Sequence, residues 1–315
     1  MTVRVYKSTD SGAPTITDVN GSLIALLKAC LVTGYGSSAA AGWTNPYNSG
    51  STIAVFRSPT GTKQRYLRVV DSGYNASVGY REARCRGYEV MTAVSTGTGL
   101  FPTTAQVAGN GIPYMYGLAS GNPYINDWIL VATEAMFHLY VNTGDNATVV
   151  SYYSNVLTFG DFISYKAGDS YNTIIRTGNE GDIPYYGGSL CSSLNSPSNS
   201  MAYIARKQTQ TGTAEYVTFG SNTLFNSSTY MGGGGIPYPN RPDSGLVLSN
   251  IFLINPDIVG SGANAYIAGV VPGIWDICHT TPTAHKDTWT QGSKSFIGLR
   301  TIGSTEYCLE TSNTW

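Results

Sequence analysis

The feature of this sequence that most constrains its fold is a long series of short β-prone segments separated by turns. Each segment alternates apolar and polar residues or is rich in β-branched and aromatic residues, as strands are. The predicted strands are residues 2–7, 52–57, 65–70, 84–90, 128–132, 136–141, 148–153, 201–206, 215–219, 246–252, 266–271, 296–300 and 305–309. Clusters of Gly, Pro, Ser and Asn lie between them. This spacing predicts a mainly β fold, an antiparallel sandwich or barrel, rather than alternating strands and helices.

One short helix is predicted, over residues 22–33. Four leucines and a cysteine recur at helical spacing on one face: Leu23, Leu26, Leu27, Cys30 and Leu31. Ser22 stands where an N-cap is expected, and Gly34 stands where a helix ends. A helix with a single apolar face must pack on a sheet.

A long polar segment suggests a division of the chain. Residues 179–200 are small, polar and nearly uncharged, and they are rich in Ser, Asn and Gly, which is typical of a loop or linker. We therefore expect an N-terminal β-rich domain over residues 1–178, containing the helix, and a C-terminal β-rich domain over residues 201–315.

Composition excludes several classes of protein. Charged residues make up 12% of the chain, against about 25% in a typical soluble protein. A net charge of −1 gives no electrostatic footprint for nucleic-acid binding, so no nucleic-acid partner is expected. Apolar residues at 42% are enough for a core and argue against disorder. With 37 Gly, and 23 Tyr against 9 Phe, the chain is expected to expose an amphipathic aromatic surface that other molecules cover.

No secretory signal and no membrane span are expected. The first residues alternate like a strand, and the longest nearly apolar stretch, residues 128–141, is interrupted by Glu134 and His138. The five cysteines are widely spaced, odd in number and without a Cys-x-x-Cys pair, so we expect reduced, buried thiols. This cysteine pattern is typical of a protein made in a reducing cytoplasm.

The residues that carry chemistry form no complete motif. The chain has no Gly-x-Ser-x-Gly elbow, and the glycine run at 232–235 is followed by Pro237 and Pro239 rather than by a phosphate-loop Lys. Glu134 and His138 would share one face of a helix. A hairpin fits the flanking residues better, with its turn at Thr133 and Glu134 and a half-buried His138 on its second strand.

Two further sets of residues are candidate sites. An ordinary loop is favoured over a zinc site for the cluster of Cys278, His279, His285 and Asp287. Any two of five carboxylates could form a glycosidase pair, but turns and solvated strand faces are the favoured interpretation of all five: Glu89, Asp127, Glu134, Asp161 and Asp169. No catalytic residue, metal or cofactor is therefore predicted.

Tyrosines beside prolines are the most informative candidates for binding. Four Gly-rich stretches place Tyr next to or near Pro, as a stiffened loop that presents a ring would. Because Tyr is enriched in protein interfaces, the predicted interface residues are Tyr114, Tyr116, Tyr124, Tyr185, Tyr186 and Tyr238. The alternative is that these rings cover the edges of the protein's own sheets.

Several short motifs resemble a virion protein family of tailed bacteriophages. They are residues 5–14 (VYKSTDSGAP), 21–24 (GSLI), 30–36 (CLVTGYG), 86–92 (RGYEVMT), 96–102 (TGTGLFP), 159–161 (FGD) and 271–275 (VPGIW), followed by His279 and by Asp287 and Thr288. The resemblance runs through most of the chain and is weakest over residues 189–244. It implies a structural part of a phage particle, present in many copies, and leaves its place on the head, neck or tail open.

Three functional hypotheses follow. The first is a non-enzymatic virion subunit that assembles with copies of itself and with other virion proteins through aromatic loops. The second is a receptor- or glycan-binding tail or fibre protein, whose Tyr and Trp rings stack on host surface sugars. The third is an enzyme that degrades an envelope polysaccharide through a carboxylate pair. The first two place the protein on the virion after synthesis in the cytoplasm of the host bacterium.

Overall fold

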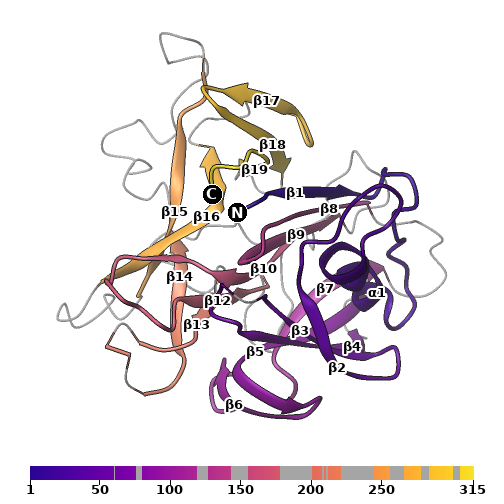
Figure 1. The fold of residues 1–315 in the computed structure, drawn as a ribbon, viewed down its shortest axis with the longest axis vertical. Helices are drawn as coiled ribbons and strands as arrows, with labels where there is room; N and C mark the ends of the chain where they lie inside the picture. The colour runs from indigo at the N-terminus through magenta and orange to yellow at the C-terminus, as the bar shows by residue number, and fades with distance from the viewer. Residues whose placement is uncertain are drawn as a thin grey trace.

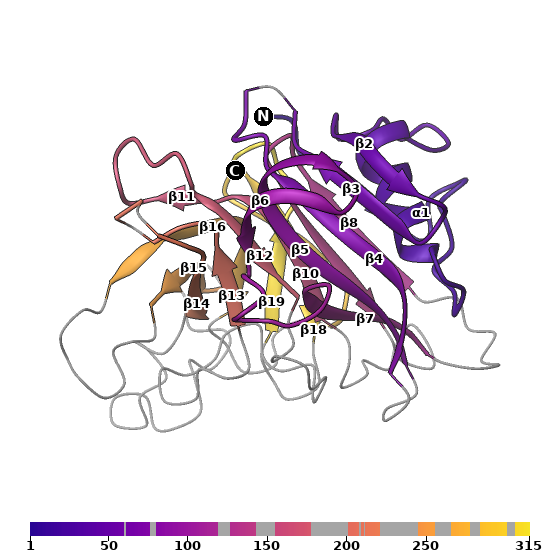
Figure 2. The ribbon, with the colours of Figure 1, turned by 90° about the horizontal axis from the view of Figure 1, so that it is seen from below.

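The computed structural model confirms a mainly β fold built from two antiparallel sheets and one short helix (Figure 1). It describes residues 1–59, 61–75, 80–118, 127–142, 155–177, 201–207, 209–210, 212–220, 245–255, 266–277, 284–300 and 306–315. The two sheets lie face to face over part of their area, as in a sandwich (Figure 2). Within these residues, no helix is both long enough and apolar enough to cross a bilayer.

The smaller sheet has six strands from the first part of the chain. They are β2 (Thr44–Ser49), β3 (Ile53–Arg57), β4 (Tyr66–Asn75), β5 (Tyr80–Ala93), β6 (Thr96–Phe101) and β7 (Ile112–Leu118). The order is β2-β3-β4-β5-β6, and β7 pairs with the N-terminal half of the long strand β5. Residues 112–116, predicted as a loop, therefore form an edge strand. Proline is tolerated there because an edge strand has one side without a ladder.

The larger sheet has thirteen strands and runs through the rest of the chain. Its path is β1 (Arg4–Lys7), β8 (Asp127–Ala132), β9 (Met136–Asn142), β10 (Asn155–Asp161), β12 (Thr173–Arg176), β13 (Met201–Ile204), β14 (Glu215–Gly220), β15 (Leu248–Ile254), β16 (Ile267–Ile277), β19 (Glu306–Glu310), β18 (Lys294–Arg300) and β17 (Thr288–Gln291). The short strand β11 (Ile163–Ser164) pairs with β16.

The predicted domain boundary falls inside this sheet. Strand β12 precedes residues 179–200 and β13 follows them, yet the two strands pair, with Ile175 opposite Tyr203. One buried cluster also joins residues from both sides of the boundary, including Trp43 and Ala214. The residues on the two sides therefore share a sheet and a core. Residues 179–200 themselves lie outside the described part of the chain.

The helix forms where the apolar stripe predicts it. The α-helix α1 (Ser22–Lys28) continues as a π-helical turn, η1 (Ala29–Thr33), and ends at Gly34, whose φ is +79°. All five residues of the stripe are buried in the core between the sheets. The predicted cap is wrong, because Ser22 is the first helical residue and its side chain caps nothing in the helix. Asp71 of β4 takes that role, accepting bonds from the N–H groups of Leu23 and Ile24 at 3.0 and 3.2 Å.

The other predicted elements are largely found. Strands β8 and β9 form the expected hairpin, closed at Thr133, whose N–H donates to Met136 O at 2.8 Å. His138 lies on its second strand as expected, but it is fully buried rather than half-buried. The predicted strand 148–153 lies outside the described residues, and β10 begins just after it.

Two buried clusters occupy the two faces of the larger sheet. The first lies between the sheets and includes the helix stripe, Phe56, Leu67 and Phe137. The second lies on the opposite face and joins β8, β12 and β15 to β18 and β19. The larger sheet must therefore curl to bring its distant strands over one core, and Figure 1 shows the two chain ends side by side.

Candidate functional site

An open cleft of about 950 Å³ is a candidate site in the described part of the chain. Its walls come from the loop before β4, the β8–β9 turn, the segment that follows β10, and Pro272 of β16. Met1 and Trp315 line it together. Ligand pockets usually have volumes of about 300–1,000 Å³, so the cleft is large enough for a small molecule.

Trp315 forms the aromatic part of the wall. Its indole Nε1 donates to Glu310 O at 3.0 Å, and its ring lies 5.4 Å from the ring of His138. The ring also packs on the backbone of Gly273, where an added Cβ would come within 2.4 Å of the indole. Only glycine at this position allows that close approach. Trp315 is thus held in place and keeps part of its surface open to the cleft.

His138 supports this wall from inside the core. Its Nδ1 lies 2.9 Å from Thr158 Oγ1, and its Nε2 lies 2.8 Å from Pro272 O. Because Pro272 O can only accept, Nε2 carries the proton and Nδ1 accepts from Thr158. Burial lowers the pKa of His138 to about 4, against a smaller opposing effect of the Pro272 bond. The imidazole is therefore neutral at physiological pH and has a structural role.

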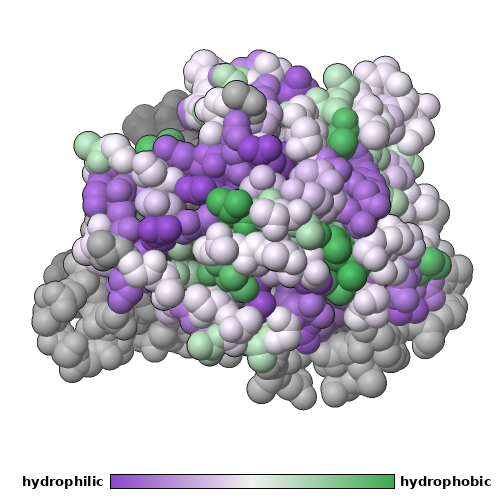
Figure 3. Space-filling view, turned by 60° about the horizontal axis from the view of Figure 1, so that its bottom comes forward, coloured by the Kyte–Doolittle hydropathy of each residue, from purple (hydrophilic) through white to green (hydrophobic). Residues whose placement is uncertain are grey.

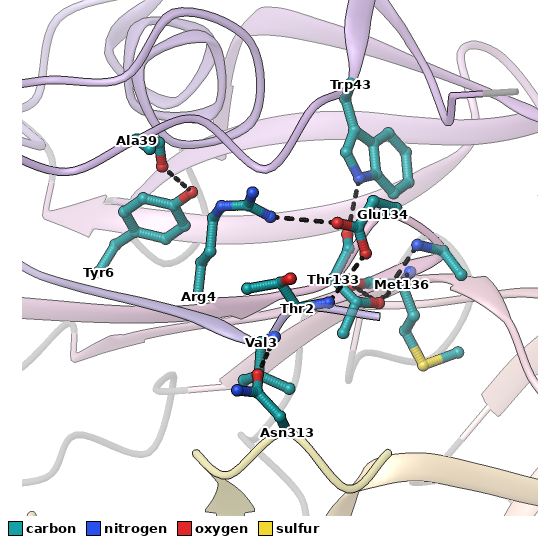
Figure 4. A network of polar contacts seen from close by, with 11 residues as sticks. Thr2, Val3, Arg4, Tyr6, Ala39, Trp43, Thr133, Glu134, Met136 and Asn313 are labelled. Carbon is teal, nitrogen blue, oxygen red and sulfur yellow. Dashed lines mark hydrogen bonds and ion pairs between the residues drawn. The ribbon is translucent and has the colours of Figure 1, made fainter.

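Glu134, at the β8–β9 turn, joins the cleft to the N-terminal segment. Its Oε2 accepts from Thr2 N at 3.2 Å, and its Oε1 pairs with Arg4 Nη1 at 3.4 Å (Figure 4). Partial burial alone would raise the pKa of Glu134. The bonds from backbone N–H groups and from Arg4 outweigh that effect, so the pKa is lowered and the carboxylate is ionised.

Two more carboxylates line the same cleft. Asp161 accepts from Lys63 N at 2.9 Å and from Thr173 Oγ1 at 2.8 Å, and burial raises its pKa in spite of these bonds. Asp169 accepts from Tyr171 N at 2.8 Å. The side chains of Lys63 and Lys166 line the cleft as well. Three carboxylates and two ammonium groups give this cleft a nearly balanced charge.

The structure separates the other two predicted carboxylates from this group. Glu89 forms a two-pronged ion pair with Arg206, at 2.6 and 2.8 Å. Asp127 pairs with Lys286 and accepts from the hydroxyl of Ser8. Both bridge segments that are distant in sequence, and their side chains are only 10% and 14% exposed, so neither is the solvated carboxylate that the sequence led us to expect.

The predicted interface tyrosines are wrong where the structure describes them. Tyr114 and Tyr116 lie on β7 with no exposed surface, inside the core between the sheets. Their hydroxyls donate to Leu139 O and to the Asp71 carboxylate, respectively. Rings buried in this way cannot contact a neighbouring subunit. The remaining four, Tyr124, Tyr185, Tyr186 and Tyr238, lie outside the described residues.

Apolar surface is limited in the described part of the chain. Figure 3 shows hydrophobic side chains as small separate groups among polar ones on the face it presents. One group stands out on paired strands: Ile163 and Tyr165, at and just after β11, and Ile267 of β16 are 55%, 56% and 42% exposed. Ile163 also borders the cleft.

The remaining candidates have ordinary surroundings. His285 packs against Tyr140 with ring centroids 5.3 Å apart, and Asp287 accepts from Ala284 N at 2.7 Å. Cys278 and His279 lie outside the described residues. Cys30, Cys85 and Cys308 are free and buried, as expected, and the other two cysteines are not among the residues described. Across the described residues, no group of three His, Cys, Asp or Glu is arranged to hold a metal.

The fold and the cleft together define an antiparallel β protein with an open cleft that Trp315, three carboxylates and two lysines line. Comparison with known proteins adds no name to this class. No protein-family model matches the chain, and no curated protein matches it.

Proposed function

We propose that the protein is a carbohydrate-binding subunit of a tailed-phage particle. The observation that carries the carbohydrate part is the partly open Trp315 ring in a cleft that also holds three carboxylates and two lysines. The phage part rests on the resemblance of the sequence motifs. Of the functions expected from the sequence, glycan binding is the one that the geometry supports best.

The chemistry of a sugar fits this lining. A sugar ring has an apolar C–H face, which packs on an indole, and a rim of hydroxyls, which donate to carboxylates and accept from ammonium groups. The nearly balanced charge of the cleft favours a neutral glycan over a polyanion. The fixed position of Trp315 reduces the entropy that binding has to overcome.

The test is a titration of the purified chain with neutral oligosaccharides such as maltotriose, cellotriose and chitotriose, followed by isothermal titration calorimetry. We expect Trp315→Ala to weaken binding by roughly tenfold or more, and Trp315→Phe to weaken it less, because the ring is kept. Lys63→Ala should weaken it by a smaller factor. Lys28→Ala is the matched control, since Lys28 does not line the cleft.

Three results would contradict the proposal. One is the absence of binding to any neutral oligosaccharide, and another is binding that Trp315→Ala leaves unchanged while circular dichroism shows an intact fold. The third is release of shorter saccharides, because turnover would make the protein the polysaccharide-degrading enzyme of the third hypothesis.

Assembly into a multi-copy structural subunit is a second candidate function. It is favoured by the exposed group Ile163, Tyr165 and Ile267, which lies on paired strands where a neighbour could cover it. Sedimentation velocity over a wide range of concentrations tests this role. We expect oligomers that the Tyr165→Ser variant weakens. A chain that stays monomeric at the highest concentration would contradict it.

A further inference from the structure

A second groove, of about 620 Å³, lies beside the two ends of the larger sheet. Strand β1 is one edge of that sheet and β17 is the other. Val5 and Lys7 of β1 line the groove together with Thr288 and Thr290 of β17. Ser295 and Ile297 of β18 and Thr311 line it as well, so the groove lies between β1 and the β17–β18 hairpin.

The hydrogen-bonding direction of β1 follows from its register. Ser8 N donates to Trp128 O at 3.0 Å, one residue beyond the last pair of β1 with β8. Because bonded pairs alternate in an antiparallel ladder, Tyr6 and Arg4 also bond to β8. The backbone groups of Val3, Val5 and Lys7 then point away from β8, toward the open edge.

Side chains bond to the backbone at both ends of this open edge, whereas the centre of the edge has no such partner among the described residues. Val3 N donates to Asn313 Oδ1 at 2.6 Å (Figure 4), and Lys7 N donates to Asp10 Oδ2 at 2.9 Å. Val5 lies between them, and its amide bonds to none of the described residues. Natural sheets protect their edges, so one unprotected residue that lines a groove is an exception.

The register of β17 likewise shows which of its backbone groups point away from its partner strand. Strands β17 and β18 form a hairpin closed by the pair Gln291 and Lys294, with two residues in the turn. In such a hairpin the closing pair is bonded, so Trp289 also bonds to β18, and the backbone groups of Thr288 and Thr290 point away from it. The free edges of β1 and β17, two strands that line the groove, thus both have backbone donors and acceptors at a spacing of two residues.

We propose that this groove binds one extended polypeptide segment as an added β-strand. At a strand spacing of about 4.8 Å, a sheet thickness of about 10 Å and a rise of about 3.3 Å, each residue of a strand fills about 160 Å³. The groove therefore holds about four residues, which matches the four residues of β1 and of β17. Only an extended backbone places both N–H and C=O groups on both of its sides at the required spacing.

The lining also indicates the side chains of this segment. Val5 and the buried Ile297 give one part of the groove an apolar surface, while Thr288, Thr290 and Ser295 provide hydroxyls. A segment that alternates β-branched apolar residues with Ser or Thr meets both. Lys7 and Asp10 carry opposite charges, so the lining shows no preference for a charged segment. Edges on both sides exclude a folded copy of this chain, whose strands belong to wider sheets.

The probe is the peptide acetyl-Thr-Val-Thr-Val-Thr-amide, and its control is the same peptide with both Val nitrogens methylated, which cannot donate along one edge. Binding is followed by NMR of the protein amides. We expect the Val5, Thr288 and Thr290 amides to shift and to gain protection from hydrogen exchange. The methylated peptide should bind roughly tenfold or more weakly.

A protein variant isolates the edge. Val5→Pro removes the N–H that faces the groove and leaves the β8 ladder intact, so it should abolish peptide binding, whereas Val5→Thr keeps the N–H and should retain binding. If Val5→Pro does not fold, Thr290→Pro makes the same change on β17. Equal binding of both peptides, or no binding by the wild-type chain, would overturn the proposal. Protection of the Val5 amide that rises with protein concentration alone would also overturn it, by giving the groove to a second copy.

Discussion

Asp71 is the residue on which the junction between the helix and the smaller sheet depends most. Its carboxylate is fully buried and accepts three hydrogen bonds, from Leu23 N, from Ile24 N and from the Tyr116 hydroxyl. Asp71 O also accepts from Gly21 N at 3.1 Å. One side chain thus caps α1 and joins it to strands β4 and β7.

The Asp71→Ala variant removes both carboxylate oxygens and with them all three of these hydrogen bonds. Each buried donor left without a partner costs about 1–3 kcal/mol, and loss of a helix cap alone costs about 0.5–2 kcal/mol. Removing a buried charge offsets part of this loss, because burial raises the pKa of Asp71 and so works against its ionised form. We expect the free energy of unfolding to fall by about 3–5 kcal/mol, a large part of the total of a typical domain.

The Asp71→Asn variant separates shape from charge. Its amide oxygen accepts from both helix N–H groups, while its NH₂ faces the Tyr116 hydroxyl, so we expect a loss of about 1 kcal/mol at neutral pH. Asp71 has a raised pKa in the folded state, so its folded state binds more protons. The wild-type stability therefore falls, relative to that of Asp71→Asn, as pH rises from the ordinary Asp value through the raised folded value.

Urea unfolding followed by circular dichroism and tryptophan fluorescence measures these differences. Asp18→Ala is the control, because Asp18 precedes the same helix but is only half-buried, and it should change stability by less than about 0.5 kcal/mol. The reasoning fails if Asp71→Ala costs less than about 1 kcal/mol, or if Asp71→Asn costs as much as Asp71→Ala.

Three further predictions test the fold around the cleft. Between pH 6.5 and 4, the wild type should lose about 3 kcal/mol more stability than His138→Gln. The reason is that the imidazole of the unfolded chain becomes protonated in this range, whereas the buried imidazole, with a pKa of about 4, stays largely neutral. Urea titrations of both proteins at each pH measure this difference. Gly160→Ala should cost more than the control Gly168→Ala in thermal melts, since both have positive φ but only at Gly160 would a Cβ meet backbone, at 2.2 Å. A double-mutant cycle on Glu89 and Arg206 should give a coupling of about 1 kcal/mol, and additive losses would contradict it.

Local sequence patterns are sufficient to predict an element where one segment determines its own structure. The stripe from Leu23 to Leu31 predicts both the helix and its buried face, and the alternation around Thr133 predicts the β8–β9 hairpin. The prediction fails where contacts between distant segments determine the local structure. Ser22 has the chemistry of an N-cap, but Asp71, which is 48 residues from Leu23, reaches the helix N–H groups instead. No local signal in the sequence marks that contact.

The cleft could not be predicted for the same reason, because distant segments form it. Glu134, Asp161 and Asp169 are among the candidate acids, but no sequence feature ranks them above Glu89 and Asp127. Lys63 and Trp315 were not predicted at all, because they reach the cleft from segments more than 250 residues apart. Such a site is created by the curling of the larger sheet, and curling depends on pairings that a single sequence does not specify.

The tyrosines show why composition alone pointed to the wrong surface. The excess of Tyr over Phe predicts aromatic loops that meet neighbours, yet Tyr6, Tyr114 and Tyr116 are buried, and each donates its hydroxyl to a partner in another element. Between two sheets, a phenol fills the volume of a Phe and also reaches a carbonyl or carboxylate on the far side. In a chain with few charged residues, such bonds are a way to fix how its layers pack. These three tyrosines therefore belong to a polar interior rather than to an interface.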